Sequence, residues 1–335
     1  MIAAVLHRYA GPLALEELDR PSLAPGEVRV RVAASGVNPL DLKIRAGQAA
    51  HARPQLPAVL GLDLAGRVEE VGRAVTGFAV GDQVFGLTGG VGGIPGSLAE
   101  EAVVDARLLA RAPDALSLRE SAALPLAFVT AWEGLVDRAR VRTGQKVLVH
   151  GGAGGVGHVA VQIARAHGAE VFATGSGASL DVITGLGAVA IDHTAEPVDD
   201  YVAKHTEGAG FDVVFDTVGG ATLDASFVAA RRYEGHVVSA LGWGSHSLAP
   251  LSFRGATYSG VFTLLPLLTG EGREHHGEIL REARRLADAG LLVPRLDERR
   301  FDLGTVEGAH ALVGSGANVG KVVVEVSSPS AGAAW

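Results

Sequence analysis

The sequence predicts an α/β protein in which a domain with a doubly wound parallel sheet is inserted into a β-rich domain. Residues 1–115 read as short strands, residues 146–241 alternate strands with helices, and the C-terminal strands return to the first style. Alternation of strands and helices is typical of a parallel sheet that is covered on both faces. We therefore expect the β-rich domain over residues 1–122 and 267–335, and the inserted domain over 123–266.

The N-terminal strands are predicted from alternation with a period of two. In EVRVRVAA, residues 27–34, three valines alternate with two arginines. The same style recurs in four segments with Gly, Pro or Asp at their boundaries: IAAVLH, GRVEEVG, DQVFGL and LAEEAVV. These segments predict an antiparallel or mixed sheet.

A helix is predicted to begin at Ser117. Ser117 and Glu120 have the spacing of a capping box, and they lead into a long apolar run. Pro125 lies inside this run, where it breaks or kinks the helix because its nitrogen carries no hydrogen to donate.

The inserted domain is predicted to continue with the strand KVLVH over 146–150, a helix over 158–169 and a strand over 170–174. Further strands are expected in VAID, FDVVFD and HVVSAL, separated by helices. Next come a strand in YSGVFTLLP, a charged helix over 273–289, and strands in RRFDL and KVVVEV. The last residues, SSPSAGAAW, are expected to fray.

A glycine motif connects the strand at 146–150 to the helix that follows it. Gly152, Gly154 and Gly157 fit the pattern G-x-G-x-x-G. In this context glycines allow a turn with positive φ, close approach of a pyrophosphate, and tight packing of the helix on its strand. Free N–H groups at the start of the helix, near Val156, favour phosphate binding. The motif therefore predicts a dinucleotide cofactor.

The end of the second strand in this domain bears on which dinucleotide binds. An NAD site usually has Asp or Glu about 20 residues after the glycines, whereas this sequence has Thr174, Gly175 and Ser176. With no carboxylate to repel it, a 2′-phosphate can bind there, with Ser176 and Ser179 as hydrogen-bond donors. NADP(H) is favoured over NAD(H), although the segment contains no Arg or Lys.

Composition excludes several classes of function. The chain has no cysteine, which rules out disulfides, cysteine-based zinc sites and cysteine nucleophiles. Its formal net charge of −8 disfavours nucleic acid and anionic membranes as partners. The N-terminus lacks the pattern of a signal peptide, and no apolar run reaches the length of about 18 residues typical of a membrane span. We therefore expect a cytoplasmic protein.

Six segments spread along the chain match the motifs of one known family. They are SGVNPLDLKIRAG, GLDLAGRVEEVGRAVTGFAVGDQVFG, AALPLAFVTAWEGL, HGGAGGVGHVAVQIA, FDVVFDTVGG and GKVVVEV. Through them the chain resembles the zinc-free quinone oxidoreductase branch of the medium-chain dehydrogenase/reductase superfamily over nearly its whole length. The resemblance implies a GroES-like β-rich catalytic domain, a Rossmann domain, and an active site in the cleft between them.

The resemblance implies that neither zinc site of the metal-dependent relatives is present. Asn38 stands where those relatives have a zinc-binding Cys, and Gly61-Leu62-Asp63 replaces their Gly-His-Glu. The short segment TGGVGGIPGS occupies the place of their four-Cys lobe. Without a Lewis acid, the expected hydride acceptors are quinones and α,β-unsaturated carbonyl compounds, whose conjugation spreads the incoming negative charge.

The resemblance also assigns residues to the site. Asn38 lies in the catalytic pocket beside the nicotinamide, and Thr174, Ser176 and His193 lie at the 2′-phosphate end. Family members that use NADP commonly have Lys and Tyr where this chain has Leu180 and His193, so the NADP preference is expected to be relaxed. The other cofactor contacts are assigned to Thr130, Gly154, Gly155, Val156, Gly157, Thr217, Val218, Gly242 and Phe262. A homodimer is expected through an edge strand at residues 256–265.

Several polar and aromatic residues have simpler interpretations. Asp41 and Asp63 are interpreted as turn and hydrogen-bonding residues rather than general acids. His275 and His276 are interpreted as solvated, because adjacent residues of a helix do not share a face. Trp243 is interpreted as a packing residue whose ring can also reach the nicotinamide pocket.

Two alternatives to the quinone or enone reductase stay open at this point. One is another reductase on the same scaffold, acting on simple carbonyls or on enoyl thioesters. The other is a nonenzymatic protein that binds NADP(H) as a redox sensor or binds RNA, although the negative net charge speaks against RNA.

Overall fold

The computed structural model describes residues 1–327. They form two compact units: unit 1 comprises residues 1–126 and the chain from 264 onward, and unit 2 comprises residues 127–263. The expected domain boundaries fall a few residues from these positions. Apart from Ser327, the tail that we expected to fray lies outside the described residues.

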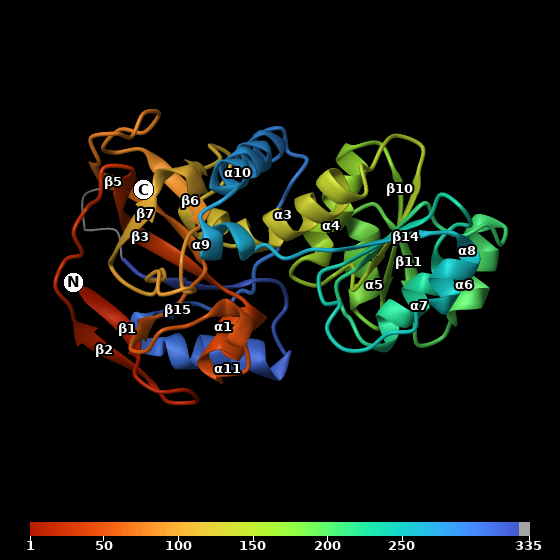
Figure 1. The fold of residues 1–335 in the computed structure, drawn as a ribbon, viewed down its shortest axis with the longest axis horizontal. Coiled ribbons are helices and arrows are strands. Elements are labelled where there is room, and N and C mark those ends of the chain that lie inside the picture. Colours follow the sequence, from red (N-terminus) through yellow and green to blue (C-terminus); the bar gives the residue numbers. More distant parts are fainter. Residues whose placement is uncertain (328–335) are drawn as a thin grey trace. The chain divides into compact units, whose positions relative to one another are not determined.

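Unit 1 is organised around the long strand β3 (Glu27–Val37), which pairs with three other strands (Figure 1). The larger sheet has the order β15-β16-β3-β5-β6-β8, with β7 also paired to β3, and a second sheet has the order β2-β1-β4. Every pairing in unit 1 is antiparallel among these strands except that of β15 with β16. The predicted antiparallel or mixed sheet is therefore confirmed.

The other strands of unit 1 are β1 (Ile2–Leu6), β2 (Leu13–Glu17), β4 (Ala58–Val59), β5 (Asp63–Val71), β6 (Gln83–Leu87), β7 (Glu101–Asp105), β8 (Leu109–Arg111), β15 (Phe301–Asp302) and β16 (Val322–Glu325). Its helices are α1 (Pro39–Arg45), α2 (Leu118–Ser121), α9 (Leu265–Thr269), α10 (Arg273–Asp288) and α11 (Val306–Ser315), with short 3₁₀ turns at Ala50–Ala52, Ala106–Leu108 and Leu303–Thr305.

The segment after β3 is a helix and not a simple turn. Asn38 has extended backbone angles and precedes α1, with Pro39 as the first helical residue, where its missing N–H costs nothing. Gly36, in β3, lies against Ala122: a Cβ there would be 2.3 Å from the Ala122 carbonyl oxygen. Gly36 allows the close approach of Ala122, and Pro39 starts the helix, so Asn38 lies between them at the carboxyl end of a buried strand.

Unit 2 contains a single parallel sheet of six strands in the order β11-β10-β9-β12-β13-β14 (Figure 1). The strand order reverses between β9 and β12, which makes these two strands the topological switch point. Helix α4 packs on β9 and β10, α5 on β10 and β11, and α7 on β12 and β13. The predicted doubly wound sheet is confirmed.

The strands of unit 2 are β9 (Lys146–His150), β10 (Glu170–Gly175), β11 (Val189–Asp192), β12 (Val213–Asp216), β13 (His236–Ser239) and β14 (Thr257–Gly260). Its helices are α3 (Pro125–Trp132), whose first two residues belong to unit 1, the π-helix at Glu133–Arg138, α4 (Gly157–Ala166), α5 (Ser179–Gly185), α6 (Val198–Thr206), α7 (Ala221–Ala229) and α8 (Ala249–Arg254).

Two predicted elements differ from the structure in extent. The helix expected from Ser117 is divided into two. Pro125 begins the second helix, because proline has no N–H to donate and is tolerated only in the first turn. The expected edge strand at 256–265 is wrong in length: β14 covers only Thr257–Gly260, and helix α9 begins at Leu265 with Pro266 in its first turn.

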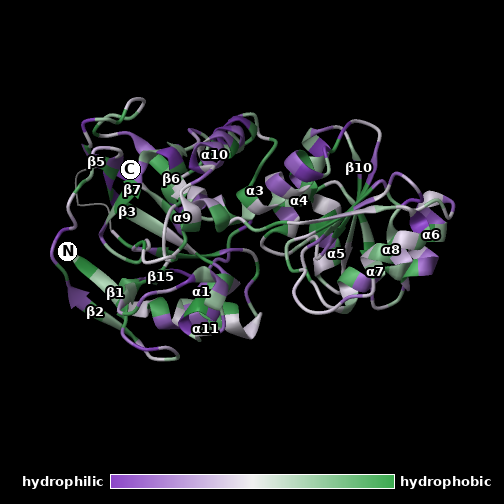
Figure 2. Ribbon diagram, viewed as in Figure 1, coloured by the Kyte–Doolittle hydropathy of each residue, from purple (hydrophilic) through white to green (hydrophobic). Residues whose placement is uncertain are grey.

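The hydropathy of the elements matches their burial. Helix α10 is mostly hydrophilic in Figure 2, but Ile279, Leu280, Ala283 and Leu286 recur at helical spacing and are buried. His276 continues this buried face, whereas His275 is exposed and hydrogen-bonds Glu278. The prediction that both histidines are solvated is therefore wrong for His276, because its position shares the period of the apolar residues.

Candidate functional site

The turn between β9 and α4 has the shape of a phosphate-binding loop. Gly151 has φ 71°, so the positive φ expected for this turn lies one residue before the three glycines of the motif. A Cβ on Gly157 would be 2.0 Å from the Gly151 carbonyl oxygen, and one on Gly152 would be 2.5 Å from Ala173 Cβ. Close packing therefore requires glycine at both positions.

Gly154 and Gly155 have a different role in this turn, because both are exposed. A Cβ on Gly154 would approach only the Gly151 carbonyl oxygen, at 3.1 Å, and so the space above it is open. Helix α4 begins directly behind them at Gly157, with Val156 half-buried. An open glycine backbone before a helix N-terminus fits the pyrophosphate of a dinucleotide.

The loop after β12 is held beside this turn at the switch point. Thr217 Oγ1 donates a hydrogen bond of 2.6 Å to the carbonyl oxygen of His150, the last residue of β9. The buried carboxylate of Asp216 accepts hydrogen bonds from the N–H groups of Val218 and Gly219 and from Ser239 Oγ, at 3.0, 2.9 and 2.7 Å. Thr217 and Val218, both predicted cofactor contacts, thus lie at the crevice where α/β sheets bind ligands.

His150 and Thr174 form a buried pair under the glycine turn. The His150 Nδ1 atom lies 3.2 Å from Thr174 Oγ1, which also accepts the Gly151 N–H at 3.2 Å. Burial lowers the pKa of His150 to about 4, so the ring is neutral at pH 7. The Thr174 hydroxyl therefore supports the turn from below, and its predicted contact with the cofactor stays a prediction.

The predicted 2′-phosphate end is exposed. Ser176 and His193 are both on the surface, at the ends of neighbouring strands, and the His193 N–H donates to the Gly175 carbonyl oxygen at 3.2 Å. Asp192 is the nearby carboxylate, and its Oδ1 accepts hydrogen bonds from the Thr194 N–H and hydroxyl, which lower its pKa. This end of the sheet therefore presents the Ser176 hydroxyl and the His193 imidazole, next to the Asp192 carboxylate that is hydrogen-bonded by Thr194.

Three other residues assigned to the nicotinamide end, Thr130, Gly242 and Phe262, lie in unit 2 as well. Thr130 is buried in α3. Gly242 is exposed, and a Cβ there would be 2.2 Å from the Tyr258 hydroxyl, so a larger residue would displace that side chain. The rings of Trp243 and Phe262 meet edge to face, with centroids 6.3 Å apart. Trp243 thus packs on Phe262, as predicted, but at 53% exposed it is not a core residue.

Asn38 belongs to a buried polar cluster in unit 1, together with Asp41, Asp63 and Lys321. Strand pairing assembles it, because β3 ends beside Asn38 and pairs with β5, which starts at Asp63, and with β16, which follows Lys321. None of the four side chains is more than 5% exposed. Lys321 lies between a glycine and a run of valines, a local pattern that gives no sign of a role in the site.

The Asn38 carboxamide is bonded at both ends within this cluster. Its Nδ2 donates to Asp63 Oδ2 at 2.9 Å, and its Oδ1 accepts a hydrogen bond from Lys321 Nζ. Asp63 Oδ1 accepts the Leu126 N–H at 2.7 Å, and Lys321 Nζ is 3.6 Å from Asp63 Oδ2. The hydrogen-bonding role predicted for Asp63 is confirmed.

Asp41 has fewer polar partners in this cluster than Asp63 has. Its Oδ2 accepts the Asn38 N–H at 2.8 Å, while its Oδ1 has no hydrogen-bond partner among the described residues. Burial raises the pKa of Asp41 to about 7 and also raises the pKa of Asp63, although Lys321 opposes the shift at Asp63. Below about pH 7 Asp41 therefore holds its proton, and the carboxyl beside the Lys321 ammonium is that of Asp63.

The Asp41→Asn variant is expected to change how stability depends on pH. The pKa of Asp41 is 3.8 in the unfolded chain and about 7 in the fold, so the native state retains this proton between those values. Stability therefore falls as the pH rises from about 4 to about 7, and between pH 5 and 7 the loss is about 2 to 3 kcal/mol. Urea unfolding of both proteins from pH 5 to 8 tests this expectation.

The variant lacks the titrating carboxyl and keeps an oxygen to accept the Asn38 N–H. The free energy of unfolding of the variant, relative to that of the wild type, should therefore increase as the pH rises. If the two plots of unfolding free energy against pH ran parallel, the raised pKa of Asp41 would be contradicted. His150 and His310, whose pKa values burial lowers to about 4, give the opposite slope. Both proteins contain them, so they cancel in the difference.

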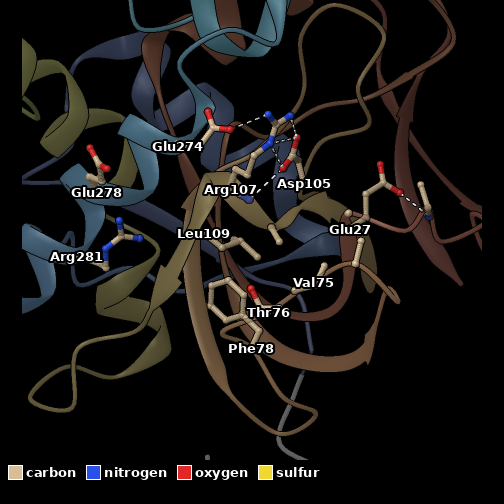
Figure 3. Close-up of a pocket in the computed structure, with 14 residues that line it drawn as sticks. Glu27, Val75, Thr76, Phe78, Asp105, Arg107, Leu109, Glu274, Glu278 and Arg281 are labelled. Carbon is tan, nitrogen blue, oxygen red and sulfur yellow. Dashed lines mark hydrogen bonds and ion pairs between the residues drawn. The ribbon is translucent and has the colours of Figure 1, made fainter.

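A separate cavity of about 690 Å³ lies in unit 1 (Figure 3). Phe78 and Leu109 line it together with Arg107, whose guanidinium is paired with Asp105 and Glu274 at 2.7 and 3.0 Å. The predicted site residues do not line this cavity. Neither the glycine turn of unit 2 nor the Asn38 cluster of unit 1 contributes a residue to its lining.

The part of the chain that the structure describes has no three His, Asp or Glu side chains grouped so as to hold a metal ion. Likewise, none of its helices is both long enough and apolar enough to cross a membrane.

Two family models match the chain. The alcohol dehydrogenase GroES-like domain matches residues 24–114, and the zinc-binding dehydrogenase model matches residues 186–324. They cover parts of the β-rich and α/β regions described above.

Among solved structures, an alcohol dehydrogenase superfamily protein from Novosphingobium aromaticivorans is 57% identical, with a TM-score of 0.95 over 98% of this chain and 100% of that one. The quinone oxidoreductase from Coxiella burnetii is 28% identical, with a TM-score of 0.82 over 97% and 99% of the two chains. The CurK enoyl reductase is 27% identical, with a TM-score of 0.85 over 97% and 99%.

Curated relatives are of two kinds. The 2-methylene-furan-3-one reductase of Solanum lycopersicum is 35% identical over 91% of this chain and 73% of its own length. The spectinabilin polyketide synthase system protein NorB of Streptomyces orinoci is 38% identical over 90% of this chain but only 13% of its own length. This chain spans between 5% and 18% of the length of six polyketide synthases that it matches.

Proposed function

Because this chain belongs to the medium-chain dehydrogenase/reductase superfamily, we propose that it is a zinc-independent, NADPH-dependent reductase of quinones or α,β-unsaturated carbonyl compounds. Its relatives include oxidoreductases, among them a quinone oxidoreductase and a reductase whose name describes an enone. The nonenzymatic alternatives lose support for the same reason.

The observation that carries the choice of acceptor is the bonding of Asn38. Its carboxamide is held between an ammonium and a carboxylate inside the protein, and it supplies hydrogen bonds only. Such a group stabilises developing charge less strongly than a metal ion acting as a Lewis acid does. Quinones and enones need less activation, because conjugation carries the incoming charge to an oxygen that hydrogen bonds can stabilise.

The cofactor, when bound, supplies the hydride. The exposed backbone of Gly154 and Gly155 fits its pyrophosphate, and the start of α4 adds a positive dipole end. Preference for NADP(H) is supported by the hydroxyl of Ser176 and the ring of His193 at the ends of β10 and β11. Along the cofactor we place Thr217 and Val218 at its ribose, with Thr130, Gly242 and Phe262 near the nicotinamide.

The proposal is tested by following the oxidation of NADPH and NADH with a panel of quinones, enones and simple ketones in the presence of EDTA. We expect turnover with NADPH and a conjugated acceptor, and little or none with simple ketones. Activity that is abolished by EDTA and restored by zinc would contradict the metal-independent reading. A strong preference for NADH would contradict the assignment of the 2′-phosphate end.

Enoyl thioesters form a second candidate class of substrate. Several curated relatives, one of them 38% identical, are polyketide synthases, and a structural relative is an enoyl reductase. An α,β-unsaturated thioester presents the same conjugated system as an enone, so the same polar cluster suits both. Crotonyl thioesters of coenzyme A and of pantetheine, compared with the corresponding methyl ketone, distinguish the two: a kcat/KM at least 10-fold higher for a thioester would make it the favoured class.

We further propose that the protein is a cytoplasmic homodimer in which β14 extends its sheet across a two-fold axis. β14 is the edge strand of the unit 2 sheet, and Thr257, Tyr258 and Gly260 are exposed. Light scattering coupled to size exclusion should give twice the chain mass of 34.3 kDa. A mass of one chain would refute the dimer.

A further inference from the structure

Lys321 is a buried cation for which the reaction has so far required no role. Its side chain is 5% exposed, which is unusual for lysine. It lies directly before β16, and the pairing of Val322 with Val37 brings it to the end of β3, next to Asn38. The two residues are 283 positions apart in the sequence.

The ammonium of Lys321 has three hydrogens and three oxygen neighbours. It donates to Asn38 Oδ1 and, at 3.4 Å, to the Val37 carbonyl oxygen, and it is 3.6 Å from Asp63 Oδ2. Its donors are thus directed at protein groups. Lys321 is therefore placed to act on Asn38 rather than on a substrate.

These contacts allow only one orientation of the Asn38 carboxamide. In the orientation observed, the amide oxygen faces the Lys321 ammonium and the amide nitrogen faces the Asp63 carboxylate. Rotation by 180° would bring oxygen against carboxylate and N–H against ammonium, and both contacts are repulsive. Leu126 holds Asp63 in place through its N–H, at 2.7 Å.

We propose that Lys321 is a positioning residue, which together with Asp63 locks the Asn38 carboxamide in one orientation for hydride transfer. The second amide hydrogen of Asn38 is then presented in a constant direction, as a preorganised donor must be. The inference rests on the proposed function, because the effect on turnover requires the reductase activity. The lock itself can be observed without turnover.

A double-mutant cycle tests whether Lys321 acts through Asn38. The variants are Lys321→Met, Asn38→Ala and the two combined, assayed for kcat, KM and NADPH affinity with the best acceptor of the panel. We expect Lys321→Met to lower kcat at least 10-fold, and to have less than a 2-fold effect in the Asn38→Ala background. Equal losses of kcat in both backgrounds would overturn the proposal and make Lys321 an independent proton donor. A basic limb of the kcat–pH profile that is lost in Lys321→Met but kept in Asn38→Ala would have the same meaning.

Two further variants keep the test decisive if Lys321→Met does not fold. Asp63→Asn combined with Lys321→Met removes both charges, which avoids an uncompensated buried carboxylate. This pair should fold and lose kcat like Lys321→Met, and wild-type kcat would overturn the proposal. Lys204→Met is the matched control, because Lys204 lies on the surface and pairs with Glu196, and it should leave kcat unchanged.

A measurement without substrate separates failure of the lock from failure of the proposed function. The side-chain NH₂ signals of Asn38 are identified in a ¹⁵N–¹H spectrum by their loss in Asn38→Ala. In the wild type they should exchange with water at least 10-fold more slowly than in the Asp63→Asn/Lys321→Met pair. Equal exchange rates would overturn the proposal that Lys321 and Asp63 fix the orientation of the carboxamide. Slow exchange in a protein that shows no turnover would support the fixed orientation and refute only the proposed reductase activity.

Discussion

Replacement of Gly154 by Asp is expected to weaken NADPH binding at least 100-fold while the fold is retained. The Gly154 position is exposed, and a Cβ there meets only one backbone oxygen at 3.1 Å. An aspartate therefore fits with a small adjustment, and it places a negative charge where the pyrophosphate is proposed to bind. Juxtaposed like charges cost several kcal/mol, and a 100-fold loss corresponds to about 2.7 kcal/mol.

Gly154→Ala is the control for the space that the side chain occupies. It adds the Cβ without the charge, so its NADPH dissociation constant should stay within a few-fold of the wild-type value. Both constants can be measured from the quenching or enhancement of NADPH fluorescence, with circular dichroism as a check of folding. Tight NADPH binding by Gly154→Asp would show that the pyrophosphate does not lie over this glycine.

Replacement of Asp63 by Ala is expected to have the largest effect on stability. The Asp63 carboxylate lies beside the buried ammonium of Lys321 and accepts hydrogen bonds from Asn38 and Leu126. Its removal leaves an unpaired cation and two unsatisfied N–H groups in the interior. Removing one partner of a buried pair costs about 3 to 5 kcal/mol, which is a large share of the stability of a protein.

The matching surface control is Glu196→Ala, which breaks the exposed ion pair with Lys204. Such pairs contribute about 0 to 1 kcal/mol, so this variant should unfold at nearly the wild-type urea concentration. If Asp63→Ala and Glu196→Ala lost equal stability, the buried ion pair would not be a structural requirement of unit 1.

Local patterns predicted the elements of unit 2 well. The strands KVLVH and VAID have the predicted bounds, because short apolar runs between glycines and polar residues offer few alternatives. The edge strand at 256–265 was overestimated, since an apolar run does not reveal where a helix containing Pro266 takes over from a strand. The prediction that His276 is solvated was wrong because the helical period places it with Ile279, Leu280 and Ala283, on the face that its neighbour His275 does not share.

The residues of the glycine turn could be predicted because they are neighbours in the sequence, whereas the partners of Asn38 could not, because they are far apart in it. The residues of the glycine turn are consecutive, and their conformation follows from the absence of a Cβ. The partners of Asn38 are not consecutive: Asp63 is 25 positions away and Lys321 is 283 positions away. No spacing rule joins residues over such separations, so Lys321 was missed and the ends of the carboxamide remained unassigned.

The sequence by itself predicted a dinucleotide-binding turn after the strand at 146–150, because the residue types of that short segment are enough to indicate it. The resemblance to the family assigned Asn38 to the place of a metal ligand in the metal-dependent relatives. Only the tertiary structure decided which way the Asn38 carboxamide faces and which buried carboxyl keeps its proton. Those properties depend on burial and on charges brought together by the pairing of β3 with β5 and β16, and they exist only once the strands have met.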